Sequence, residues 1–156
     1  MLRVQWSAIA VFIACIACGP APTQEHTTLA LETEDPRFQI FLEGPLPLTK
    51  DATRRELRLS LLPKIGWHMT PEAPTLLELS QASGIELDLP LQQIEDAVHS
   101  SEERIEFAIT YHSLDGHVPD VSNPHLEARL KFGVCRNDNP RCEIVRREFQ
   151  IPLTPL

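Results

Sequence analysis

Two cysteines near the C-terminal end of the chain have the spacing for a disulfide bond. Cys135 and Cys142 flank the segment Asn137–Pro140, whose residue types are typical of a tight turn. If the turn is centred between Asp138 and Asn139, the two cysteines lie opposite each other in an antiparallel ladder. Residues in that position have Cα atoms about 4.5–5.5 Å apart, within the range that a disulfide accepts. The sequence therefore predicts a disulfide across the last hairpin.

The residues around the pair predict where this disulfide lies and what it could do. Because Val134 belongs to the apolar set of its strand, Cys135 and Cys142 are predicted to point to the solvent side. Arg136 and Arg141 flank them, and positive charge favours the reactive thiolate over the thiol. Two interpretations stay open: a bond that exchanges electrons with other proteins, or an inert clamp in an exported domain. A clamp across so short a loop contributes only about 2–3 kcal/mol, so stabilisation alone is a weak reason for it.

The turn also sets the register of the whole hairpin, and most of the resulting pairs are consistent with a buried and a solvent face. The predicted pairs are Leu126 with Ile151, Ala128 with Phe149 and Phe132 with Val145 on the core face, and Arg129 with Glu148 on the outer face. The register also places Leu130 opposite Arg147. This mismatch predicts a bulge or an exposed edge.

Other chemistry has weaker support in the sequence. Four histidines could be gathered by loops and bind copper or zinc together with a reduced cysteine: His68, His112, His117 and His125. No two of them have the close spacing of metal ligands, so we expect no metal site and no other cofactor. No serine stands in a nucleophile elbow, and no glycine-rich phosphate loop is present.

Alternation of apolar and polar residues dominates the chain from residue 37 onward and predicts β-strands. In Glu56–Leu61 every second residue is leucine, and Arg104–Tyr111 alternates in the same way. Further strands are predicted at 38–42, 76–79, 85–89, 126–134 and 145–151. About seven short strands separated by turn residues predict an all-β antiparallel sandwich. A single short helix is predicted within 91–98.

The first residues have the layout of an exported lipoprotein. Arg3 precedes the apolar run Ala8–Ala17, which is shorter than the roughly 20 residues that span a bilayer and is typical of a signal peptide. The segment Cys15–Gly19 resembles a lipobox, in which Cys18 becomes the lipidated N-terminus. Cys15 is a second candidate, and a plain signal peptide with incidental cysteines is the alternative.

These features predict three parts and an envelope location. We expect a signal peptide at 1–17, a flexible tether rich in Pro, Thr and Glu at 18–36, and one folded domain at 37–156. The chain without residues 1–17 keeps all 22 acidic residues and loses one of 14 basic ones, so its net charge is −9. Such a charge argues against nucleic acid as a partner. We expect a periplasmic, lipid-anchored protein, at the outer rather than the inner membrane.

Two stretches of the chain resemble the DsbD N-terminal-like domains of thiol:disulfide interchange proteins. The segment Gly66–Pro74 is similar to the family's motif of an aromatic residue and a histidine after a glycine. The segment Leu130–Cys135, followed by Cys142 and Phe149–Leu153, is similar to the family's last hairpin. The resemblance covers about residues 37–153.

The resemblance implies an immunoglobulin-like sandwich with one redox-active cysteine pair. Cys135 and Cys142 would be that catalytic pair, and Cys142 would form the mixed disulfide with partners. The residues expected to line the site are Trp67, His68, Arg136 and Arg141. The implied partners are periplasmic disulfide proteins and a membrane electron donor, as separate proteins. The aromatic cap of the family has no match in Leu91–Glu103, and a lipid-anchored binding or structural domain with an inert disulfide is the alternative function.

Overall fold

The computed structural model describes residues 26–45, 54–80, 83–114 and 125–153. The predicted signal peptide, the lipidation site Cys18 and the first residues of the predicted tether lie outside these ranges and stay predictions. No helix formed by the described residues combines the length and the apolar character that a membrane crossing needs.

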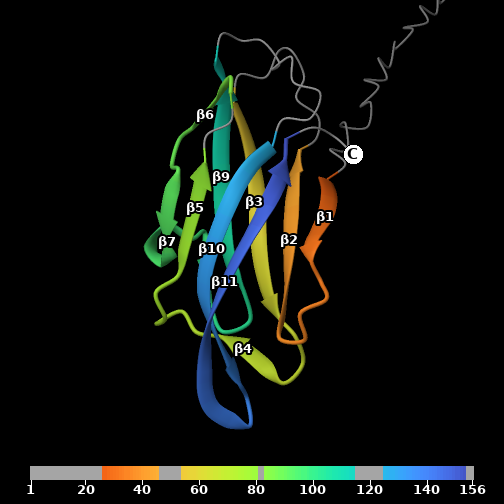
Figure 1. Ribbon diagram of the computed structural model, residues 1–156, viewed down its shortest axis with the longest axis vertical. Helices are drawn as coiled ribbons and strands as arrows, with labels where there is room; N and C mark the ends of the chain where they lie inside the picture. The colour runs from red at the N-terminus through yellow and green to blue at the C-terminus, as the bar shows by residue number, and fades with distance from the viewer. Residues whose placement is uncertain (1–25, 46–53, 81–82, 115–124, 154–156) are drawn as a thin grey trace, which may run out of the picture.

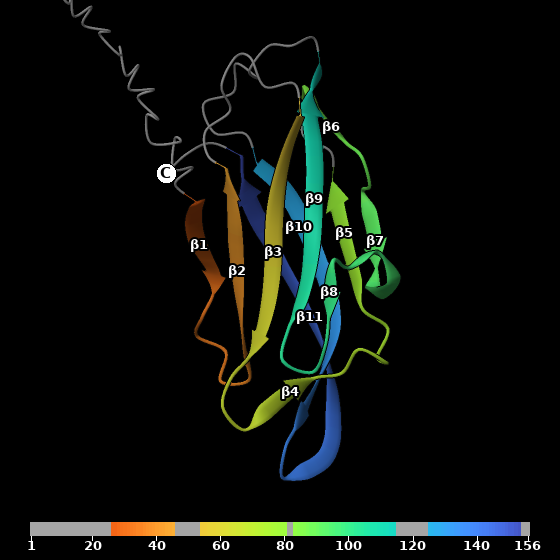
Figure 2. The same cartoon turned by 180° about the vertical axis from the view of Figure 1, so that it is seen from behind.

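The described residues form an immunoglobulin-like sandwich of two antiparallel sheets (Figures 1 and 2). The first sheet has the order β1-β2-β3-β9-β6, with β8 also paired to β9. Its strands are β1 (His26–Glu32), β2 (Phe38–Pro45), β3 (Arg54–Pro63), β6 (Ile85–Leu87), β8 (His99–Ser100) and β9 (Ile105–Ser113). This result confirms the predicted fold class.

The second sheet has the order β11-β10-β5-β7, with β4 also paired to β10. Its strands are β4 (Trp67–Met69), β5 (Leu76–Ser80), β7 (Leu91–Gln93), β10 (His125–Arg136) and β11 (Asn139–Pro152). The tip of the β10–β11 hairpin extends beyond the other strands, and β4 lies beside it at the same end of the molecule (Figure 1). The candidate disulfide is therefore carried by the most protruding hairpin of the described chain.

All seven predicted strands are present, and the structure adds β1, β4, β7 and β8. The prediction of a flexible tether over 18–36 is wrong from residue 26 onward, because β1 pairs along β2 and packs Leu29 and Leu31 against the core. Two leucines among threonine, alanine and glutamate form too short an alternation to predict a strand. The predicted helix within 91–98 is reduced to one 3-10 turn, η1 (Ile94–Asp96), after β7.

The core lies between the sheets and contains the predicted inward-facing residues. Leu57, Leu59 and Leu61 of β3 are at most 1% exposed. Phe38 of β2 meets Phe132 of β10 in an edge-to-face contact with ring centroids 4.9 Å apart, which joins the two sheets. Burying such a side chain contributes about 1.5–3 kcal/mol, so this alternation provides the main driving force for the sandwich.

The predicted register of the last hairpin is confirmed from Leu126↔Ile151 through Cys135↔Cys142. Beyond the cysteines the register shifts, and Arg136 pairs with Asn139. The turn is therefore formed by Asn137 and Asp138, one position earlier than predicted.

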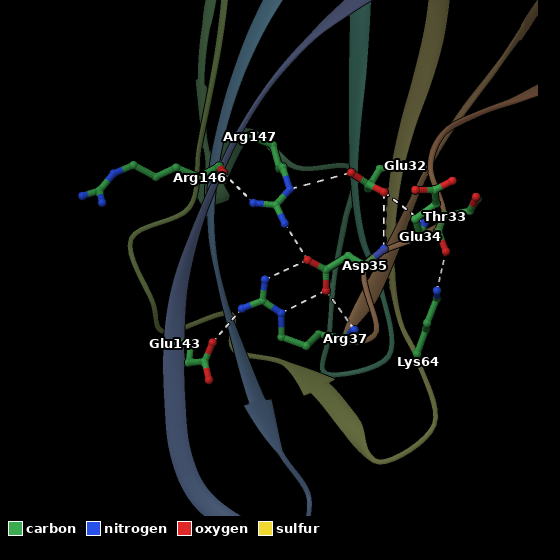
Figure 3. A network of polar contacts seen from close by, with 9 residues as sticks. All are labelled: Glu32, Thr33, Glu34, Asp35, Arg37, Lys64, Glu143, Arg146 and Arg147. Atoms are coloured by element: carbon green, nitrogen blue, oxygen red, sulfur yellow. Dashed lines mark hydrogen bonds and ion pairs between the residues drawn. The ribbon is translucent and has the colours of Figure 1, made fainter.

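The mismatch of Leu130 with Arg147 is explained by a network of charges between the β1–β2 turn and the edge strand β11 (Figure 3). The Asp35 carboxylate, whose side chain is 6% exposed, accepts from Arg147 at 2.5 Å and from Arg37 at 2.7 Å. Arg147 comes from the core face of β11, and its guanidinium also lies 5.1 Å from the Phe38 ring centroid. An inward-pointing charge on an edge strand also opposes pairing with another chain.

This network lowers the pKa of Asp35 to about 2, chiefly because Arg37 donates hydrogen bonds to its carboxylate. Burial opposes the shift, and the charges of Arg37 and Arg147 add to it. Arg37 also pairs with Glu143 of β11 at 2.6 Å, so one buried carboxylate links the β1–β2 turn to the edge of the opposite sheet.

Replacing Asp35 by Asn should lower the free energy of unfolding at pH 7 by about 2 kcal/mol, because two arginines lose their shared carboxylate. The native pKa of Asp35 lies below its ordinary value of 3.8, so its contribution is complete above that pH and is lost as the pH falls toward 2. Urea denaturation from pH 2 to pH 7 measures the difference, which should vanish at the acid end. Glu148→Gln is the control, since Glu148 and Arg129 are 77% and 66% exposed and their pair contributes little. Equal pH curves for Asp35→Asn and the wild-type protein would contradict this account.

Candidate functional site

Cys135 of β10 and Cys142 of β11 form a disulfide, as predicted. They are register partners in the hairpin, with Cα atoms 4.1 Å apart, slightly closer than expected. The bond closes the protruding end of the hairpin just before its turn.

The two cysteines differ in their access to solvent. Cys142 is exposed, whereas Cys135 is only 2% exposed. Strand alternation places Cys135 on the outer face, since its neighbour Val134 is fully buried in the core between the sheets. The prediction that both cysteines reach solvent is nevertheless wrong for Cys135, because another segment of the chain covers the outer face at this point.

The cover is the segment Thr70–Pro74, which joins β4 to β5 along one edge of β10 and folds over its outer face at Gly133. The Thr70 amide donates to the Gly133 carbonyl at 3.1 Å. A Cβ atom added at Gly133 would lie 2.4 Å from the Ala73 Cβ and 3.3 Å from the Thr70 Cβ, so only glycine allows this close approach. We call residues Thr70–Pro74 the covering segment.

The covering segment also supplies a hydrogen-bond donor to the buried sulfur. The Thr70 Oγ1 atom lies 2.6 Å from the Cys135 Sγ atom. A disulfide sulfur carries no hydrogen, so the hydroxyl group is the donor. A hydroxyl in this position stabilises negative charge that develops on Cys135 when the bond opens.

Strand pairing brings two of the four predicted site-lining residues, Trp67 and His68, to the end of the hairpin that carries the disulfide. Strand β4 pairs with β10 so that His68 is opposite Cys135 and Trp67 is opposite Arg136. The His68 Nδ1 atom lies 2.8 Å from the Asn137 Oδ1 atom, which ties the ring to the hairpin turn. From the sequence, only the family resemblance placed Trp67 and His68 near the cysteine pair. The pairing of β4 with β10 is the physical reason that they lie there.

The positive charges of Arg136 and Arg141 favour a thiolate at the disulfide less than the positions of these residues in the sequence suggest. Arg136 pairs with Asp138 at 2.9 Å, and its guanidinium carbon lies 5.8 Å from the centroid of the Trp67 ring. Its charge is thus directed to a carboxylate and an aromatic face. Arg141 adjoins Cys142 in β11 and is exposed.

Sequence reasoning missed Thr70, Ala73 and Gly133. One signal was available, because a glycine inside a strand pattern indicates a bulge or the close approach of another backbone. The identity of the approaching segment could not be read from spacing, since Thr70 and Gly133 are far apart in the chain.

His68 and His112, two of the histidines that the structure describes, are not gathered into one site. His112 of β9 contacts Glu86 at 3.1 Å and Asp88 at 3.5 Å, beside β6. Strand β6 and strand β4, which carries His68, lie at opposite ends of the molecule (Figure 1). His117 lies outside the described residues. Within the described ranges, no group of three or more His, Cys, Asp or Glu side chains is arranged to hold a metal ion.

The fold and the site define an immunoglobulin-like β-sandwich with a half-covered disulfide in its last hairpin. The chain matches no family model, and no curated protein matches it significantly. Among solved structures, it is similar to the GAE domain of yeast GGA1, over 78% of this chain and 97% of that one. The identity is 12% and the TM-score is 0.44, and this likeness gives no information about the disulfide.

The fit of the covering segment on Gly133 can be tested by adding one methyl group. Gly133→Ala should displace the segment, so that a small thiol forms its mixed disulfide with Cys135 as well as with Cys142, and lower the free energy of unfolding by about 1–3 kcal/mol through overpacking. Adding Ala73→Gly should confine the adduct to Cys142 again, because it removes the atom that the new Cβ would meet at 2.4 Å. Mass spectrometry after alkylation of the free thiol identifies the modified cysteine.

Gly44→Ala is the matched control for general destabilisation, because a Cβ there would meet a Leu57 side-chain atom at 2.4 Å, far from the cysteines in the fold. It should lower stability and leave the adduct on Cys142 alone under native conditions. A Gly133→Ala protein whose adduct is confined to Cys142 would show that the covering segment does not protect Cys135.

Proposed function

We propose that this domain is a thiol–disulfide interchange module that reacts with its partners through Cys142. The observation that carries the proposal is the asymmetry of the bond. Cys142 is exposed on β11, while Cys135 is buried and accepts a hydrogen bond from the Thr70 hydroxyl. Exchange needs one sulfur open to attack and one that leaves readily, and the two cysteines meet these needs separately.

The direction of attack is also favourable. The attacking thiolate must approach Cys142 in line with the S–S bond, from the side opposite Cys135. That side is the free edge of β11, since β10 is the only strand that pairs with β11 among the described residues. A partner thiol can therefore reach Cys142 without displacing a strand.

The proposed reaction proceeds in two balanced steps. A partner thiolate attacks the Cys142 sulfur, the bond to Cys135 breaks, and Cys135 takes the electron pair as a thiolate. A second partner thiolate then attacks the partner's own sulfur in the mixed disulfide and releases Cys142. The partner gains a disulfide, and the domain gains two electrons and, on protonation, two protons. The reverse sequence delivers electrons, with Cys135 resolving the mixed disulfide.

The partners and the location belong to the same proposal. The N-terminal residues have the layout of a lipoprotein signal with Cys18 as the lipidated residue. A lipid-anchored domain in the periplasm would exchange with periplasmic disulfide proteins and with a membrane electron donor. Such a compartment permits the oxidised form that the hairpin carries.

One observation favours the second candidate, a lipid-anchored binding or structural domain with an inert clamp. The burial of Cys135 beneath the covering segment protects one half of the bond. The reduction potential separates the candidates, since structural disulfides lie below about −300 mV and labile ones lie higher. We expect a value above this limit.

Single cysteine variants test which sulfur meets the partner. Cys135→Ala should accumulate mixed disulfides through Cys142 in cells, because the resolving thiol is absent. Cys142→Ala should accumulate far fewer, since the remaining Cys135 lies under the covering segment. Non-reducing gels of envelope fractions measure the cross-linked species. Equal trapping by both variants, or by neither, would contradict the proposal.

The hydroxyl of Thr70 offers a finer test of the leaving group. Thr70→Val should slow attack on Cys142 by about tenfold or more, because a hydrogen bond to a charged group contributes roughly 1.5–3 kcal/mol. Thr70→Ser should restore the rate. Thr75→Val is the matched control, because Thr75 is buried nearby and its hydroxyl donates to the Ala73 carbonyl at 3.3 Å. Stopped-flow reduction by an excess of thiol measures the rates, and an unchanged rate for Thr70→Val would remove Thr70 from the mechanism.

A further inference from the structure

Two basic side chains lie directly opposite each other on the outer face of the hairpin. Lys131 of β10 is the register partner of Arg146 of β11. Like charges in this position destabilise a sheet. The next outer pair along the same strands is complementary instead, with Arg129 and Glu148 at 3.3 Å. Neither Lys131 nor Arg146 makes an ion pair with any other described residue.

This basic pair belongs to the same surface as the exposed Cys142. Cys142, Ile144 and Arg146 follow one another on the outer face of β11, because side chains alternate along a strand. All three are exposed. At 44%, Ile144 is one of the few exposed large apolar side chains among the described residues. We call Cys142, Ile144, Arg146 and Lys131 the outer strip.

The surroundings of the outer strip limit where an anion could bind. Lys131 also borders a hollow of about 460 Å³ whose lining includes Glu72 and Glu95. These carboxylates disfavour an anion on that side of Lys131. The unneutralised positive charge therefore lies between Lys131 and Arg146, in a chain whose formal net charge is −8.

We infer that the outer strip binds an extended acidic segment of the redox partner, next to the partner's reactive cysteine. The inference rests on the proposed function and names the partner's chemistry. An apolar side chain of the segment packs on Ile144, and a carboxylate lies between Arg146 and Lys131, where two cations offer charge-assisted hydrogen bonds. An extended segment suits the strip, because Cys142, Ile144 and Arg146 lie in line on the same face of one strand.

The spacing along β11 makes the inference specific. Arg146 stands four positions after Cys142, and a strand rises about 3.3 Å per residue, so the two positions are about 13 Å apart. The partner's acidic residue should stand about four positions from its cysteine when the segment is extended. An acidic residue directly beside the cysteine would miss the basic pair.

The experiment uses the oxidised domain and four cysteine peptides of equal length. One peptide has Asp or Glu four positions from the cysteine, one has it adjacent, one has Lys at the fourth position, and one is neutral. We expect the first to exchange about tenfold faster than the neutral peptide at low salt, because complementary charge raises encounter rates. High salt should remove most of this advantage, since exposed charges are screened.

Charge reversal tests the residues of the outer strip. Lys131→Glu with Arg146→Glu should invert the order, so that the lysine peptide becomes the fastest and the acidic peptide becomes slower than the neutral one. Arg54→Glu is the matched control, because Arg54 is an exposed arginine of the other sheet. It should keep the wild-type preference for the acidic peptide.

The outcomes distinguish this inference from the function on which it rests. Equal rates for all four peptides would contradict the inference that the outer strip binds an acidic segment, and would leave the proposed interchange activity in place. No exchange with any peptide, together with a reduction potential below about −300 mV, would overturn both. A wild-type dimer in size-exclusion chromatography that the double charge reversal converts to monomer would assign the strip to a second copy of the chain, and would also overturn the inference.

Discussion

The pairing of β10 with β11 is the interaction on which the rest of the structure depends. Both strands must place their apolar residues inward, and a slip of one residue would turn every side chain to the other face. This constraint alone brings Cys135 opposite Cys142 on the outer side. It also sends Arg147 inward to the buried carboxylate of Asp35 and leaves Arg146 outside. Two neighbouring arginines thus have opposite roles because a strand alternates.

The same pairing explains how the edge strand β11 is attached to the opposite sheet. β11 is the edge of its sheet, and the apolar alternation of its inner face is interrupted by Arg147. An arginine there would be costly if it were alone, because a charge that is partly removed from water needs a partner. Asp35 supplies that partner, and Phe38 lies against the guanidinium. The mismatch of Leu130 with Arg147 predicted a bulge or an exposed edge. Strand β11 is indeed the edge of its sheet, and Arg147 forms an ion pair there with Asp35 of the β1–β2 turn.

Alternation within a strand was readable from the sequence, and contacts between distant segments were not. The seven main strands, the hairpin register and the disulfide followed from period-two patterns and turn residues. Strand β1 was missed because Leu29 and Leu31 are its only large apolar residues in the part that packs on the core. The burial of Cys135 was missed because the alternation of side chains predicts the face of the strand on which a residue lies. It does not predict whether another segment covers that face. A glycine at position 133, inside a predicted strand, indicated that another part of the backbone approaches closely. The sequence did not indicate which segment this is.

The covering segment reconciles protection with reactivity at the disulfide. A bond sealed at both sulfurs would be an inert clamp, and one open at both would react through either cysteine. Here the cover on Gly133 shields Cys135 and leaves Cys142 on the free edge of β11. The same segment places a hydroxyl on the shielded sulfur, which stabilises the charge that forms there. In the proposed reaction the cover thus determines which sulfur is attacked and assists the sulfur that leaves, and both effects depend on one glycine with no side chain to obstruct it.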